Sequence, residues 1–159
     1  MGVSVNVPTV EIFGQRVLHP SVEELIDLVT ALKQEGFNMV IDLTAVDYVS
    51  FPTRTDLPES VNPERFEVVI LMINHQTRER LRLRVQVEEK NPVVPSLFDL
   101  YPGTEAMERE VFDMFGINFS DHPDLTRILM PEDWVGHPLR KDFSVGQIPV
   151  QFKASKVKR

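Results

Sequence analysis

Hydrophobic and polar residues alternate most regularly in the middle of the chain. Residues 78–87 alternate between two faces, with Leu81, Leu83, Val85 and Val87 on one and arginine or glutamine on the other, a period of two that is typical of a β-strand. Residues 65–74 are apolar on both faces in the middle, which predicts a strand in the centre of a sheet. The pattern also predicts a strand over residues 37–48 and a short extended piece around residues 7–13.

Two other segments have helical spacing. Ser21 and Glu24 form a capping-box pattern, apolar residues then recur on one helical face, and Gly36 is expected to end this first helix. The second helix is expected to take Thr104 as its N-cap and to stop at Gly116, which can adopt the left-handed C′ conformation.

The second helix has two distinct faces. Its apolar face consists of Met107, Val111, Met114 and Phe115. Glu105, Arg109 and Asp113 follow the opposite side at intervals of four residues, so the arginine is expected to pair with both acids. Phe112 lies off the apolar face and Glu110 lies at its margin. Either these two residues meet a local loop and solvent, or the helix is covered on more than one side.

Residues 118–143 show neither a helical nor an alternating period. Three prolines keep the residues before them extended, and large apolar residues such as Trp134 are interleaved with charges. Long coil of this kind is uncommon within a compact domain, so it is expected to lie across another surface, of this domain or of a partner. The sequence predicts an α+β domain over residues 1–117, with a mostly antiparallel sheet packed by two or three helices, and an extended C-terminal arm over residues 118–159.

Composition narrows the classes of function. The 159 residues, of which 42% are hydrophobic, suffice for one ordinary domain. Because the chain has no cysteine, it cannot contain disulfides, thiol nucleophiles or cysteine-ligated iron–sulfur clusters. The formal net charge of −7 disfavours non-specific binding to nucleic acid or anionic lipid. No signal peptide is expected, and the longest aliphatic run, residues 68–73, is too short to cross a bilayer, so membrane association is expected only through partners.

No short catalytic motif is present in the sequence. The arginines of residues 78–84 lack the aromatic neighbours of nucleic-acid platforms, which favours a solvated strand face or a contact with an acidic partner. His122 and His137 each precede a proline near carboxylates; a composite metal site is one interpretation, and hydrogen bonds or partner contacts are the favoured one. Glu108 and Glu110 are two residues apart and do not face each other on a helix. There is no nucleotide-binding glycine loop or Ser/His/Asp signature.

An ordered series of uncommon residue combinations extends from residue 91 to residue 143. The combinations are Asn91-Pro92, Pro95-Ser96, Glu108-Arg109-Glu110, Asp113-Met114-Phe115-Gly116-Ile117, His122-Pro123-Asp124-Leu125, Arg127-Ile128-Leu129 and Gly136-His137-Pro138-Leu139-Arg140-Lys141-Asp142-Phe143. This series resembles the signature of the 30 kDa subunit family of respiratory NADH–quinone oxidoreductase (complex I) and its hydrogenase-linked relatives. Two residues depart from the family pattern: Ala106 stands where the family often has tryptophan, and Thr126 where it usually has a basic residue. Partner contacts at these two positions are therefore expected to differ from those of the family.

The resemblance implies a cofactor-free, non-catalytic subunit of the peripheral arm of a proton-translocating complex, on the cytoplasmic side of the cell membrane. Iron–sulfur clusters, FMN, NADH and quinone would belong to partner subunits, especially the quinone-site subunit, the terminal-cluster subunit and the ferredoxin-like subunit. The C-terminal arm would wrap such partners. The residues expected at partner interfaces are Glu108, Arg109, Glu110, Asp113, His122, Arg127, Trp134, His137, Arg140, Lys141 and Asp142.

Two alternatives stay open at this point. The chain could be the equivalent subunit of a related quinone oxidoreductase that takes electrons from another donor such as ferredoxin, or of a membrane-bound hydrogenase. An alternative of another class is a stand-alone carboxylate- or metal-dependent enzyme.

Overall fold

A computed structural model describes residues 6–51 and 53–144 of the chain. Its elements are β1 (Thr9–Ile12), β2 (Gln15–Leu18), α1 (Leu25–Gln34), β3 (Met39–Asp47), β4 (Phe66–Asn74), β5 (Glu79–Val87), β6 (Val93–Pro95), the 3-10 helix η1 (Pro102–Thr104), α2 (Glu105–Phe115) and β7 (Asn118–Ser120). The first five strands form one sheet in the order β1-β2-β5-β4-β3, in which β2 and β5 run parallel and the other neighbours antiparallel. β6 and β7 form a separate parallel pair. The predicted α+β fold with a mostly antiparallel sheet is confirmed.

The short extended piece near the N-terminus is a hairpin of two strands. Phe13 and Gly14 join β1 to β2 with φ angles of 51° and 73°, and positive φ at both central residues is what a type I′ turn requires. β2 then pairs with β5, where Leu18 lies opposite Leu83. The sequence indicated one extended piece because each of these strands has only four residues.

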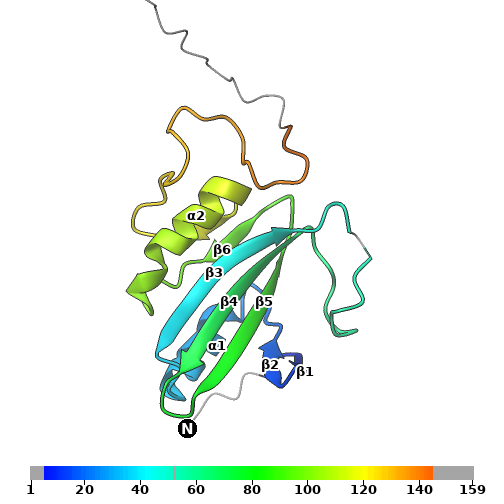
Figure 1. Ribbon diagram of the computed structural model, residues 1–159, viewed down its shortest axis with the longest axis vertical. Coiled ribbons are helices and arrows are strands. Elements are labelled where there is room, and N and C mark those ends of the chain that lie inside the picture. Colours follow the sequence, from blue (N-terminus) through cyan, green and yellow to red (C-terminus); the bar gives the residue numbers. More distant parts are fainter. Residues whose placement is uncertain (1–5, 52, 145–159) are drawn as a thin grey trace, which may run out of the picture.

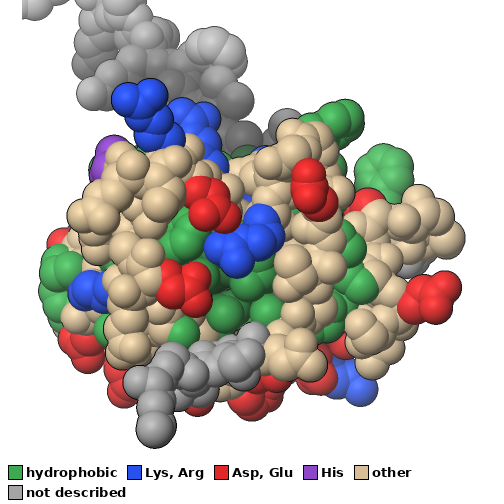
Figure 2. Space-filling view, turned by 90° about the horizontal axis from the view of Figure 1, so that it is seen from below, with side chains coloured by type: hydrophobic (Ala, Val, Ile, Leu, Met, Phe, Trp, Pro, Cys, Tyr) green, Lys and Arg blue, Asp and Glu red, His purple; other side chains and the backbone are tan. Residues whose placement is uncertain are grey.

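The core lies on one face of the large sheet. Phe66 lies opposite Val87 and Met72 opposite Leu81, so the apolar residues of β4 and β5 point to the same side. The buried apolar residues of both helices belong to the same hydrophobic cluster as these strand residues, so α1 and α2 cover this face, and α1 is seen behind the sheet in Figure 1. Figure 2 shows hydrophobic side chains gathered in the middle of the view from below, with acidic and basic side chains among and around them.

The capping-box hydrogen bonds predicted between Ser21 and Glu24 are present, and they close the turn that leads into α1, whose N-cap residue is Glu24. The Ser21 N–H donates to the Glu24 carboxylate at 2.9 Å, and the Glu24 N–H donates to the Ser21 hydroxyl at 3.3 Å. Gly36 follows the helix with a φ of 99°, and a Cβ atom there would lie 2.8 Å from Nδ2 of Asn74. The Asn74 side chain donates to the Glu35 carbonyl at 3.1 Å, which fixes the helix end to the sheet.

The described part of the predicted arm, residues 118–144, begins inside the fold. Its first three residues form β7, which pairs with β6 through Val94 and Phe119. The rest first runs alongside α2, where His122 lies 3.2 Å from the Glu105 carbonyl, and then passes the C-terminal end of the helix, where Figure 1 shows it in orange. Residues 145–159 of the predicted arm lie outside the described residues.

Candidate functional site on helix α2 and the arm

Asp113 on α2 is the main attachment point of the arm. Its side chain is fully buried, and its Oδ2 atom accepts the backbone N–H groups of Ile128, Leu129 and Met130 at 3.1, 2.8 and 2.8 Å. The Arg127 guanidinium pairs with the other carboxylate oxygen. Burial alone would raise the pKa of Asp113, but these N–H groups and the arginine together hold it below its usual value. The carboxylate is therefore ionised at neutral pH and binds one turn of the arm.

Glu108 connects the other side of α2 to the segment before it. This carboxylate is fully buried and accepts hydrogen bonds from the Leu97 N–H and the Thr104 hydroxyl, both at 2.8 Å, and from the Ser96 hydroxyl at 2.5 Å. Thr104 occupies the N-cap position of α2, as predicted, but its hydroxyl donates to Glu108 and caps no backbone N–H. Glu108 therefore holds the strand–helix connection together from inside.

The arm also covers the C-terminal end of α2. The Leu139 N–H donates to the Met114 carbonyl at 3.0 Å, the Arg140 guanidinium donates to the Phe115 carbonyl, and a His137 ring nitrogen lies 3.0 Å from the Asp113 carbonyl. The last carbonyl groups of a helix have no partner within it, and here the arm supplies partners. The pKa of His137 is lower than its usual value, mainly because the ring is buried and also because Arg140 and Arg127 lie nearby.

Gly116 makes this close approach possible. It ends α2 in the left-handed conformation, as predicted, with a φ of 71°. A Cβ atom at this position would lie 2.5 Å from Nε2 of His137 and 2.7 Å from an Arg140 nitrogen. A side chain there would therefore separate the arm from the helix.

A second attachment fixes the arm to the sheet. Oδ2 of Asp47, at the end of β3, accepts the Lys141 N–H at 2.9 Å, and the same oxygen pairs with Arg65 at 2.9 Å. Arg65 also pairs with Asp142 at 2.8 Å. Burial opposes ionisation of Asp47, but Arg65 and the Lys141 N–H lower its pKa below the usual value. The sequence analysis missed Asp47 and Arg65, because nothing local links them to residues so far along the chain.

The structure places the residues predicted at partner interfaces in two groups. The first group makes contacts within the chain; its members include Glu108, Asp113, Arg127, His137 and Arg140. His122 and Arg109 also belong to it: a His122 ring nitrogen lies 3.2 Å from the Glu105 carbonyl, and Arg109 donates to the Thr126 carbonyl at 3.1 Å. Arg109 pairs with Glu105 at 3.6 Å, whereas its expected pairing with Asp113 is wrong, since Arg127 occupies that carboxylate. Trp134 is half-buried and stacks on Phe143 with ring centroids 6.4 Å apart.

The second group is open to solvent. Glu110, Lys141 and Asp142 are exposed, although the Lys141 backbone and the Asp142 carboxylate also hold the arm to the sheet. Contacts of these residues with partners stay a prediction. The arm also exposes four apolar side chains, here called the arm patch: Ile128, Leu129, Val135 and Leu139, with exposed fractions of 40, 60, 87 and 48%.

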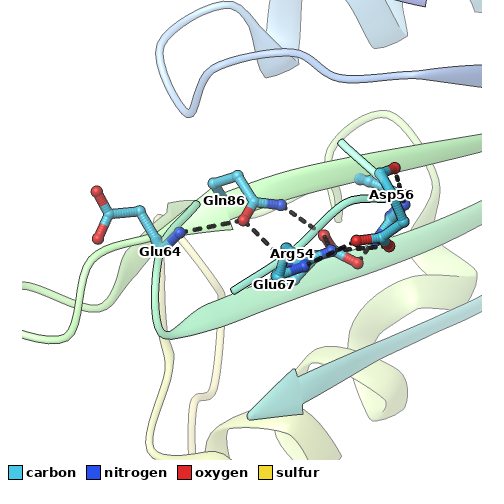
Figure 3. A network of polar contacts seen from close by, with 6 residues as sticks. Arg54, Asp56, Glu64, Glu67 and Gln86 are labelled. Atoms are coloured by element: carbon cyan, nitrogen blue, oxygen red, sulfur yellow. Dashed lines mark hydrogen bonds and ion pairs between the residues drawn. The ribbon is translucent and has the colours of Figure 1, made fainter. Parts of the chain in front are cut away.

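A buried ion network on the other face of the sheet was not foreseen. Glu67 on β4 accepts from Arg84 on β5 and from Arg54 in the β3–β4 loop, both at 2.8 Å. Figure 3 shows Arg54, Asp56 and Glu67 close together in this network. Asp56 pairs with Arg84 at 2.6 Å. Burial alone would raise the pKa of Asp56, but Arg54 and Arg84 lower it to about 2. The expectation of a solvated arginine face is therefore wrong for Arg84, which is 7% exposed.

The described residues contain neither a candidate metal site nor a membrane-spanning helix. Over residues 6–51 and 53–144, no three histidine, aspartate or glutamate side chains are placed to hold a metal ion together. Within the same ranges, no helix is both long enough and apolar enough to cross a membrane.

Comparison with known proteins identifies the family. Residues 18–148 match the model of the family described as respiratory-chain NADH dehydrogenase, 30 Kd subunit. The chain belongs to this family. An NADH-quinone oxidoreductase subunit from Roseiflexus sp. (strain RS-1) is 43% identical over 145 residues, which cover 89% of this chain and 77% of that protein. The corresponding NADH-quinone oxidoreductase subunit from Moorella thermoacetica is 45% identical over 122 residues, covering 76% and 74%.

Solved structures agree with this assignment. The chain is similar to the trypsin-resistant fragment of Nqo5, with a TM-score of 0.66 and 31% identity over 75% of this chain and 89% of that one. A chain of an archaeal respiratory membrane complex, the membrane-bound sulfane sulfur reductase, matches with a TM-score of 0.68 and 20% identity over 98% of this chain and 92% of that one. The second likeness shows a shared fold. The family resemblance drawn from residues 91–143 is thus confirmed.

Proposed function

We propose that this 30 kDa-type chain is a structural subunit in the peripheral arm of a proton-translocating NADH–quinone oxidoreductase, on the cytoplasmic side of the cell membrane. Its neighbours would be the quinone-site subunit, the terminal-cluster subunit and the ferredoxin-like subunit. Membership of the family supports the kind of complex. In this proposal the chain is non-catalytic, and FMN, NADH, quinone and the clusters are held by other subunits. The absence of cysteine supports this for the iron–sulfur clusters, because such clusters are held mainly by thiolates.

The arm patch is the observation that carries the proposal. Its four apolar side chains lie on backbone that is fixed to α2, since the Asp113 carboxylate binds the N–H groups of Ile128 and Leu129. Arg127 also donates to the Gly136 carbonyl at 3.0 Å, which ties the stretch containing Val135 to the same anchor. A surface of exposed apolar groups on well-anchored backbone is suited to contact with another protein.

The energies are adequate for such a contact. Burying a fully exposed leucine or valine side chain stabilises by about 1.5–3 kcal/mol, and the partly exposed members of the patch would contribute about half of that each. Because the arm is already ordered by its internal hydrogen bonds, association loses less conformational entropy than the ordering of a free segment would. The arm thus acts as a preorganised contact surface.

The proposal is tested by recovering the tagged chain from membranes of its source organism. Wild-type chain is expected to bring down an NADH–quinone oxidoreductase that oxidises NADH with quinone. Leu129→Ser combined with Val135→Ser should lower the recovery of the other subunits. The matched control is Phe13→Ser in the β1–β2 turn, where the phenyl group is 104% exposed, and this variant should behave as the wild type.

Each outcome has a defined meaning. Wild-type chain that brings down a complex reducing quinone from another donor, or a hydrogenase, would favour the related complexes over this one. Wild-type chain that brings down no other subunit would contradict the proposal. Equal recovery by the double variant and the Phe13→Ser control would exclude the arm patch as the contact surface.

A further inference from the structure

A cavity of about 430 Å³ lies on another part of the molecule, between the N-terminal end of α1 and the loop that enters β4. Its lining includes residues 19–24 before and at the start of α1, residues 60–62 of the loop, and residues 86–88 at the end of β5. The volume lies within the range of sites that bind ligands or side chains. No residue from the described part of the arm, 118–144, contributes to it.

The lining of this cavity is acidic. It contains four glutamates and, in the part of the chain that the structure describes, neither lysine nor arginine; the glutamates are Glu23, Glu24, Glu64 and Glu88. Glu23, Glu24 and Glu88 are exposed at the surface. Figure 3 shows the Glu64 carboxylate directed away from the neighbouring ion network. Close carboxylates of one sign create a field that attracts cations.

The wall beside Glu64 is fixed by the ion network. The Gln86 side-chain oxygen accepts the Glu64 N–H at 3.3 Å and an Arg54 N–H at 3.2 Å, while its amide group donates to Glu67. Both network arginines have acidic partners of their own. The network therefore holds the wall in position, and among the described residues its arginines pair with Asp56 and Glu67 and not with the glutamates of the cavity.

An unpartnered imidazole lies in the same wall. His19 lines the cavity, is only 2% exposed, and neither of its ring nitrogens has a hydrogen-bond partner among the described residues. A buried polar group without a partner is destabilising, so such groups are uncommon unless something binds them. Burial, and next the charge of Arg84, lowers the pKa of His19, so the ring is neutral at neutral pH and does not repel a cation. The ring torsion of histidine is broad, so a small turn can bring one nitrogen to the cavity.

We infer that this cavity is a docking site for a lysine- or arginine-bearing segment of a neighbouring subunit in the complex, a step that rests on the proposed function. The glutamates bind the cationic group, and His19 accepts or donates a hydrogen bond to the polar part of the same segment. The remaining lining includes Pro20, Val22 and Val61. These apolar residues suit the aliphatic stem of a long basic side chain, whose charged end remains near water.

A metal ion is not the expected occupant, since the described acidic and histidine side chains include no group of three arranged as ligands. A segment of protein is favoured over a small free cation because the lining combines apolar residues with carboxylates, and a long basic side chain can contact both. A small cation is therefore an outcome of the test rather than the inference.

Carboxyl labelling tests the inference in the wild-type protein. The isolated chain and the complex purified from membranes are each treated with a water-soluble carbodiimide and glycinamide, and the modified residues are measured by mass spectrometry. Labelling of Glu23, Glu64 and Glu88 is expected to fall several-fold in the complex. Glu35, exposed at the end of α1, serves as the reference carboxylate and should label equally in both forms.

Charge variants show whether the occupant is cationic. Glu64→Lys with Glu88→Lys is expected to weaken retention of the subunit in the complex by about tenfold at low salt, because like charges would meet at the contact. Glu64→Gln with Glu88→Gln should give a smaller loss that disappears as salt is raised. Glu35→Lys is the matched control and should be retained normally.

The results separate the possible failures. If the wild-type chain joins the complex but the cavity glutamates label equally in both forms, this inference fails while the proposed function stands. If the glutamates are protected in the complex but the charge variants are retained like the wild type, the occupant is apolar and the inference of a cationic occupant is overturned. Protection of the isolated chain by spermine, with none gained in the complex, would identify a small-cation site and overturn the docking site. A wild-type chain that joins no complex would overturn the proposed function, and this inference with it.

Discussion

Replacement of Asp113 by alanine should detach the arm from helix α2. The change removes a fully buried carboxylate that binds three backbone N–H groups and pairs with Arg127. Removing one member of a buried pair typically costs about 3–5 kcal/mol, because the other member is left without a partner. The Arg127 side chain is 15% exposed and can regain some water, which favours the lower end of that range, about 3 kcal/mol.

Two measurements on the isolated chain check this prediction. Urea unfolding followed by circular dichroism should show a loss of about 3 kcal/mol, equivalent to a melting temperature lower by about 6–12 °C for a domain of this size. Hydrogen exchange should become faster at the amides of Ile128, Leu129 and Met130, which lose their acceptor.

A matched variant controls for loss of charge. Asp124 is also on the arm but is exposed, so Asp124→Ala should change the free energy of unfolding by no more than about 0.5 kcal/mol. If Asp113→Ala costs less than about 1 kcal/mol and leaves the exchange of the three amides unchanged, the carboxylate is not the anchor of the arm, and the reasoning is refuted.

Three further predictions concern the isolated chain. Glu67→Ala should destabilise it by about 3–5 kcal/mol in urea unfolding, because two buried arginines lose their shared acceptor; a loss below about 1 kcal/mol would show that these arginines rehydrate. Gly116→Ala should cost more than about 1 kcal/mol, given its positive φ and crowded surroundings, whereas Gly103→Ala, with open space around it, should be far milder; equal costs would exclude the close approach of the arm. Because the pKa values of Asp113 and Asp56 are lowered in the folded state, to about 2 for Asp56, the stability they contribute is present above about pH 4 and is lost as the pH falls through the folded values; an acid titration of the unfolding free energy that is flat between about pH 4 and pH 2 would contradict this.

Features decided by local pattern could be predicted from the sequence. The alternation over residues 78–87 predicted strand β5, and the Ser21–Glu24 pattern predicted the hydrogen-bonded turn that leads into α1, because each signal depends on neighbours within a few residues. The left-handed end of α2 at Gly116 followed from the conformational freedom of glycine. The signature that places the chain in its family is likewise continuous in the sequence.

Pairings between distant residues could not be predicted. Arg84 resembled a solvated strand residue because the carboxylates that neutralise it come from another strand and from a loop. Arg109 had a plausible partner in Asp113 at helical spacing, yet Arg127, 14 residues further on, occupies that carboxylate. Lys141 and Asp47 are 94 residues apart, so no local pattern could connect the arm with the end of β3. These contacts form only once the folded sheet and α2 bring distant parts of the chain together.

The most direct test of the account is a cryo-EM structure of the complex purified through this chain. The account predicts that the arm patch, Ile128, Leu129, Val135 and Leu139, lies against another subunit while the Asp113 anchor keeps its contacts with residues 127–130. It also predicts that no cluster, flavin or quinone is bound by residues of this chain. A complex in which these four side chains face solvent, or in which this chain binds one of those cofactors, would contradict the proposed structural role.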